Sequence, residues 1–115
     1  MIGDIARFLL TGAAGVLLAA PFSSSCHAGG TVEVSIIDYK FIPAELKITP
    51  GTTVTWVNNE KRTAHSVLFP SEGGLESERF FPGESYSRTF DKPGSYPYRC
   101  GPHEEMKGRI EVISE

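Results

Sequence analysis

The pattern of apolar and polar positions divides this chain into two unlike parts. Residues 8–20 form an apolar run of mostly small and aliphatic side chains without a charge. From residue 31 onward, apolar and polar positions alternate in short runs that are separated by turn residues. Alternation with a period of two is typical of β-strands that bury one face. The sequence therefore predicts a β-rich domain behind a leader of different character.

Several short segments of the second part have this strand pattern. Two of the intervening turns are strong: Pro50-Gly51 and residues 91–94, which read Asp-Lys-Pro-Gly. The predicted strands are residues 31–36, 46–48, 52–57, 65–69, 85–90, a segment with Tyr96 and Tyr98 beside Cys100, and residues 108–113. Short strands at this spacing, with no persuasive helix among them, favour an all-β Greek-key sandwich or barrel.

The longest predicted connection is the loop at residues 71–84. It carries four glutamates and one arginine, together with two Gly- or Pro-containing turns. Such a charged segment between two strands is typical of a solvated loop. A docking surface is the functional alternative at this position.

The apolar run at residues 8–20 is too short for a membrane-spanning helix, which needs about 20 residues. It is preceded by an arginine and followed by small residues, as in a secretory signal. We therefore expect a helical signal peptide at residues 1–28, a single mature domain at residues 29–115, and export to the periplasm. A retained membrane anchor and a lipoprotein signal that ends at Cys26 are the alternatives.

Charge and cysteine content narrow the function. The net charge is −3, and no basic stripe that would suit nucleic acid is visible. The chain has two cysteines, Cys26 and Cys100, and the first would leave with the signal peptide or be acylated. A single thiol in an oxidising compartment is a liability unless something occupies it. A bound metal ion would do so.

The segment YRCGPHEEMKGRI, near the C-terminus, supplies candidate ligands. Cys100, His103 and Met106 follow one another at three-residue intervals. A thiolate, an imidazole and a thioether together suit copper better than a hard cation, and zinc seldom uses methionine. Only one other histidine, His65, remains in the mature chain, so it is the candidate for a second nitrogen ligand. Each of these four residues alone could be an ordinary core or surface residue. Chance would then have to explain all four of them together.

These residues lie in segments that resemble the cupredoxins, the small blue copper proteins. The resemblance covers residues 34–112 and is strongest in PGTTVTWVNNEKRTAHSVLF and GSYPYRCGPHEEMKGRIEV. The two-residue gaps of the Cys-x-x-His-x-x-Met loop are similar to those of the amicyanins, whereas the loops of plastocyanins and azurins are longer. The resemblance implies a plastocyanin-like domain with one type 1 copper per chain, bound by His65, Cys100, His103 and Met106.

The resemblance also implies a function. Cupredoxins carry single electrons, and four protein ligands leave no open position for a substrate, so we expect no enzyme activity. The histidine of the ligand loop, His103, would be the electron port in an apolar patch, for which Pro102, Met106, Phe69 and Pro70 are candidates. Amicyanins pass electrons from methylamine dehydrogenase to c-type cytochromes. We therefore expect a monomer with transient redox partners, such as a periplasmic dehydrogenase as donor and a c-type cytochrome as acceptor.

Two local features bear on the redox properties. Ser66 stands where an asparagine is common in the family, and that asparagine ties its loop to the ligand loop. Glu104 and Glu105 add negative charge beside His103, which would favour Cu(II) if it is poorly solvated. Two alternatives to an electron carrier stay open: a periplasmic copper-delivery protein, and a structural sandwich with an incidental thiol.

Overall fold

The computed structural model describes residues 29–114 of the chain. The predicted signal peptide, residues 1–28, lies outside the described residues. The elements are β1 (Thr31–Ile37), β2 (Lys40–Ile42), β3 (Glu45–Ile48), β4 (Thr52–Asn58), β5 (Leu68–Phe69), the 3-10 turn η3 (Pro70–Glu72), β6 (Leu75–Glu76), β7 (Ser85–Phe90), β8 (Gly94–Arg99) and β9 (Lys107–Val112). Within this part of the chain no helix is long and apolar enough to cross a membrane.

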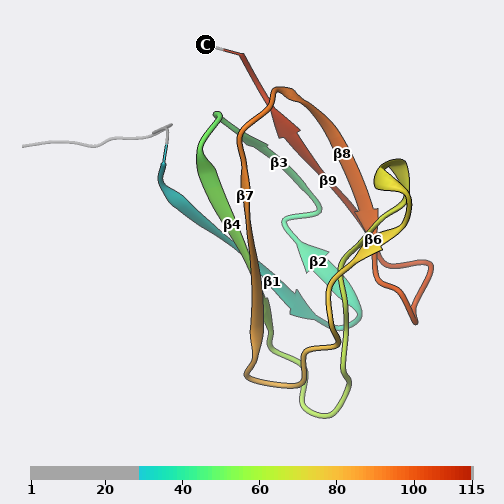
Figure 1. The fold of residues 1–115 in the computed structure, drawn as a ribbon. Coiled ribbons are helices and arrows are strands. Elements are labelled where there is room, and N and C mark those ends of the chain that lie inside the picture. Colours follow the sequence, from blue (N-terminus) through green and yellow to red (C-terminus); the bar gives the residue numbers. More distant parts are fainter. Residues whose placement is uncertain (1–28, 115) are drawn as a thin grey trace, which may run out of the picture.

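The strands form two sheets that pack face to face (Figure 1). One sheet has the order β2-β1-β4-β7, and the other has the order β3-β9-β8-β5-β6. Most neighbours are antiparallel, but β1 pairs with β4 and β3 pairs with β9 in parallel. Strands that are distant in the sequence therefore lie side by side, which confirms the predicted all-β sandwich.

The core lies between the two sheets and follows the alternation of the sequence. In β4 every second residue from Thr52 to Asn58 is buried, and Val54 and Trp56 are completely so. The Trp56 ring packs against Phe69 and Tyr98 of the second sheet, with ring centroids 6.3 Å and 5.3 Å away. Large aromatic rings at the centre of a small sandwich bury much apolar area and fix the distance between its sheets.

Three differences from the sequence prediction concern the end of the sandwich that holds the candidate ligands. The pattern did not reveal β2 or β6, because strands of three and two residues are too short to show a period. The predicted strand at 65–69 is strand only at Leu68–Phe69, with an isolated bridge between His65 and Phe80. Residues 71–84, expected to be a loop, contain β6 and part of η3.

Candidate metal centre

Three of the four predicted ligands converge at one end of the sandwich. The Cys100 sulfur lies 3.5 Å from Nδ1 of His65 and 3.5 Å from Nδ1 of His103. The three donor atoms all lie within 4.8 Å of one another. His65 and Cys100 are completely buried, whereas His103 is partly exposed. The structure thus brings together residues that are 35 positions apart along the chain.

The loop between β8 and β9 places two of these donors. Cys100 follows the last residue of β8, and its backbone N–H donates to the carbonyl of Met106 at 3.0 Å. The N–H of Met106 in turn donates to the carbonyl of His103 at 3.0 Å. These two bonds close the loop, and Met106, the last residue of the loop, is 2% exposed. A closed loop of this kind holds its side chains in one arrangement while the strands on either side supply rigidity.

His65 is fixed from the opposite side. Its backbone exchanges two hydrogen bonds with Phe80, and its ring Nε2 lies 3.2 Å from Oε2 of Glu60. A carboxylate at Nε2 selects the tautomer in which Nε2–H donates and Nδ1 keeps its lone pair facing Cys100. Burial lowers the pKa of His65, the nearby His103 lowers it further, and Glu60 partly offsets both. His65 is therefore held as a neutral imidazole, the form that binds metals.

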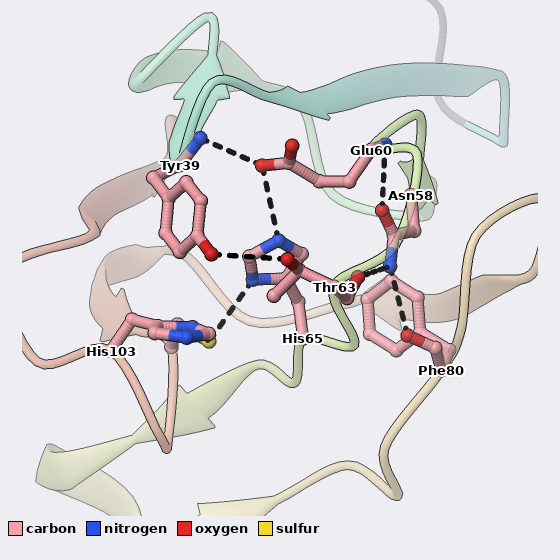
Figure 2. Close-up of polar contacts among 8 residues, drawn as sticks. Tyr39, Asn58, Glu60, Thr63, His65, Phe80 and His103 are labelled. Carbon is pink, nitrogen blue, oxygen red and sulfur yellow. Dashed lines mark hydrogen bonds and ion pairs between the residues drawn. The ribbon is translucent and has the colours of Figure 1, made fainter.

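A short polar network shapes the segment that carries Glu60 (Figure 2). Asn58 is completely buried, and its side-chain amide donates to the carbonyls of Thr63 at 2.8 Å and Phe80 at 3.0 Å. Its side-chain oxygen accepts the N–H of Glu60 at 2.9 Å. In the sequence, Asn58 is only the residue that follows the predicted strand at residues 52–57. No local pattern reveals that its side chain braces the segment in front of His65.

A second link joins the two sides of the site. The Gly101 N–H donates to Oγ of Ser66 at 3.0 Å, and the Ser66 hydroxyl donates to Oε2 of Glu76 at 2.7 Å. A Cβ at position 101 would overlap that same Glu76 oxygen and lie 2.7 Å from Ser66 Oγ, so any other residue would have to displace these side chains and break the link. Ser66 therefore does connect its segment to the ligand loop, despite the shorter reach that a serine has. Glu76 extends the link to β6 and was missed, because the sequence showed it as one of several loop glutamates.

The surface around His103 is less apolar than expected. Met106 and Phe69 are buried, at 2% and 1% exposed, so their predicted place in a surface patch is wrong. Both belong to the core, where their volume is needed between the sheets. Pro102 and Pro70 are exposed. Glu104 and Glu105 are exposed as well, so water screens much of their charge.

The donor set fits a metal ion with a preference for soft ligands. Ions such as zinc bind imidazole nitrogen at about 2.0–2.1 Å and thiolate sulfur at about 2.3 Å, so donors that share one ion lie roughly 3–4 Å apart. The 3.5 Å separations between Cys100 and the two histidines agree with that value. A His2Cys core with a thioether on the same loop is the donor set of electron-transfer copper sites.

Comparisons with known proteins point to the same metal. Residues 28–113 match the family described as copper binding proteins, plastocyanin/azurin family. Amicyanin-alpha of Methylorubrum extorquens is 40% identical over 87 residues, which cover 72% of this chain and 72% of that protein. An oxidised variant of amicyanin superimposes with a TM-score of 0.68 at 32% identity, over 71% of this chain and 81% of that one.

The same fold also occurs within a larger protein. A copper-containing nitrite reductase from Thermus scotoductus superimposes with a TM-score of 0.68 at 33% identity. The match covers 73% of this chain but 22% of the reductase, so the shared part is one domain of that protein. The family match, the amicyanin relatives and the convergent donors agree, and copper is the cofactor that they indicate. The chain belongs to the copper binding proteins of the plastocyanin/azurin family.

Proposed function

We propose that this protein is a periplasmic carrier of single electrons, with one type 1 copper ion bound by His65, Cys100, His103 and Met106. The observation that carries the proposal is the position of the Cys100 sulfur, 3.5 Å from Nδ1 of each histidine and completely buried. The amicyanin relatives of the chain are electron-carrying cupredoxins rather than enzymes.

Bound copper supplies a Cu(II)/Cu(I) couple, and the protein keeps its ligands in one arrangement for both states. The carboxylate of Glu60 fixes the ring of His65, and the link from Gly101 to Ser66 fixes the start of the ligand loop. Burial of His65 and Cys100 keeps water away from the donor atoms. Because these parts are set before an electron arrives, little has to move during transfer.

The partly exposed ring of His103 is the proposed route for the electron. Docking over this ring would be brief and would use a small interface, as is usual for redox encounters. A dehydrogenase as donor and a c-type cytochrome as acceptor are the partners that we propose, in keeping with the similarity to amicyanin. No open ligand position is left for a substrate when all four side chains bind, so the proposed role excludes catalysis by this domain alone.

Copper delivery is the competing function. A protein that hands its copper to an acceptor needs donors that the acceptor can reach. Here the sulfur of Cys100 and the ring of His65 are fully buried, and hydrogen bonds hold the ring of His65 and the start of the ligand loop. These features favour retention of the ion over its transfer.

An optical titration of residues 29–115 with Cu(II) tests the proposal. We expect an intense thiolate-to-copper band that saturates at one ion per chain and bleaches reversibly with ascorbate. The matched variant Cys100→Ser keeps the size of the side chain but removes the thiolate, so this band should be lost completely. A wild-type protein without the band, or a Cys100→Ser variant that keeps it, would contradict the proposed ligand set.

A further inference from the structure

The turn between β1 and β2 has an unusual backbone for its sequence. It consists of Asp38 and Tyr39, whose φ angles are +55° and +58°. Positive φ at both positions is the mark of a type I′ hairpin turn, which favours Asn-Gly or Asp-Gly. Asp38 suits its position, but a tyrosine in the left-handed region is strained where glycine would not be. Strain of this kind is kept where the side chain has a use.

The Tyr39 ring lies directly against the candidate metal centre (Figure 2). It meets the ring of His103 edge to face, with centroids 4.9 Å apart, and the ring of His65 with centroids 5.6 Å apart. Its hydroxyl shares a 3.0 Å hydrogen bond with Oγ1 of Thr63. Tyr39 is 47% exposed while His65 is 0% exposed, so the tyrosine forms part of the cover over the two imidazoles.

The backbone of Tyr39 is tied to the same site. Its N–H donates to Oε2 of Glu60 at 2.7 Å, and that oxygen is also the acceptor for Nε2 of His65. One carboxylate oxygen thus joins the hairpin turn to the buried histidine. The ring and the backbone of Tyr39 act on the two imidazoles by different contacts.

We propose that Tyr39 is a positioning residue that clamps the two histidine ligands. This inference rests on the proposed copper function. The partly exposed His103 has the looser surroundings of the pair, and the Tyr39 ring restricts its rotation and shields it from water. Glu60 holds the turn so that the ring stays in this place. The strained backbone of Tyr39 is the consequence of putting an aromatic side chain where the turn alone would favour glycine.

The variant Tyr39→Gly separates this role from a merely structural one. Glycine relaxes the turn and keeps the N–H that binds Glu60, so only the ring and its hydroxyl are lost. Asp38→Gly is the matched control, because it relaxes the same turn at a residue that makes no hydrogen bond, ion pair or ring contact with either histidine among the described residues. We expect both metal-free variants to melt at or above the wild-type temperature.

The copper-loaded proteins should differ. Transfer of Cu(II) to excess EDTA should become about tenfold faster in Tyr39→Gly, as is usual when a group that supports a ligand is removed. The charge-transfer and electron paramagnetic resonance spectra should shift in this variant as well. Asp38→Gly should match the wild type in both measurements. Tyr39→Phe, which keeps the ring, should restore most of the wild-type behaviour.

Three results would overturn the clamp. One is a Tyr39→Gly protein with wild-type release and spectra, another is an Asp38→Gly protein that is equally altered, and the third is a Tyr39→Phe protein that behaves like Tyr39→Gly. If Tyr39→Gly does not fold, Tyr39→Asn makes the same comparison, since asparagine tolerates this backbone. A wild-type protein that shows no thiolate-to-copper band would overturn the proposed function, and the clamp with it.

Discussion

The two sides of the metal centre are built in different ways. On one side, Cys100, His103 and Met106 come from a single loop that is closed by its own backbone hydrogen bonds. On the other side, His65 is positioned by side chains that belong to no such loop: Glu60, five residues before it in the segment after β4, and Tyr39 of the β1–β2 turn. The ligand loop is a local structure, whereas the surroundings of His65 exist only in the folded sandwich.

This difference predicts how each side responds to change. The ligand loop depends on backbone geometry and on the hydrogen-bonded link from Gly101 to Ser66 and Glu76. Steric changes should therefore harm it most. The His65 side depends on a buried imidazole next to a carboxylate that is 11% exposed. Changes of charge and protonation should act mainly there.

The largest effect that we expect on the ligand loop comes from Gly101→Ala. The added Cβ would overlap Oε2 of Glu76 and crowd Oγ of the buried Ser66, so these side chains would have to move and the link would be lost. Overpacking of this kind reduces the free energy of unfolding by about 1–3 kcal/mol. Chemical denaturation of the metal-free protein measures it.

A double variant shows whether the link is the cause. Glu76→Ala should recover part of the loss when it is combined with Gly101→Ala, because the closest overlap is then gone. The Ser66 contact would still remain. Strictly additive losses for the two substitutions would argue that the link has no part in positioning the loop.

The contrast between the two sides also explains what the sequence could reveal. The three proposed donors of the ligand loop lie within seven positions, so their spacing is visible, and the strands with a clear alternation are confirmed. The carboxylates that bind His65 and Ser66 carry no such mark. Glu60 and Glu76 look like any surface glutamate until β4, β6 and the loops are folded against one another. Glu60 lies five residues from His65 but also binds Tyr39, 21 residues away, and Glu76 meets Ser66 across ten residues. No spacing rule of the sequence predicts such contacts.

An intermediate effect should come from the carboxylate behind His65. Glu60→Gln keeps the size and an acceptor oxygen but removes a negative charge 3.2 Å from the ring. Because that charge favours Cu(II) over Cu(I), its loss should raise the reduction potential, on the order of tenfold in the equilibrium or about 59 mV. Protein-film voltammetry measures the shift.

The matched control is an exposed carboxylate of the ligand loop. Glu105→Gln removes the same charge from a solvated position, where screening by water and salt weakens its effect. We therefore expect a clearly smaller shift in potential than for Glu60→Gln. Equal shifts would mean that burial next to His65 does not set the strength of the interaction. The two sides of the centre would then not differ in their response to a change of charge.

The smallest effect concerns protonation of His65 in the metal-free protein. Burial lowers the pKa of His65 below 6.5, the ordinary value that it regains on unfolding. Below about pH 6.5 the unfolded chain then binds more protons than the folded one, so the free energy of unfolding should decrease as the pH falls, until His65 is protonated in the fold too. One proton limits the slope to about 1.4 kcal/mol per pH unit.

Denaturation curves between pH 5 and pH 7 (roughly the range in which histidine titrates) should show this decrease in the wild type and lack it in His65→Gln. Bound copper should suppress it, because Nδ1 is then occupied. Parallel curves for the two metal-free proteins would mean that folding does not lower the pKa of His65. The His65 side of the centre would then be no more sensitive to protonation than the ligand loop.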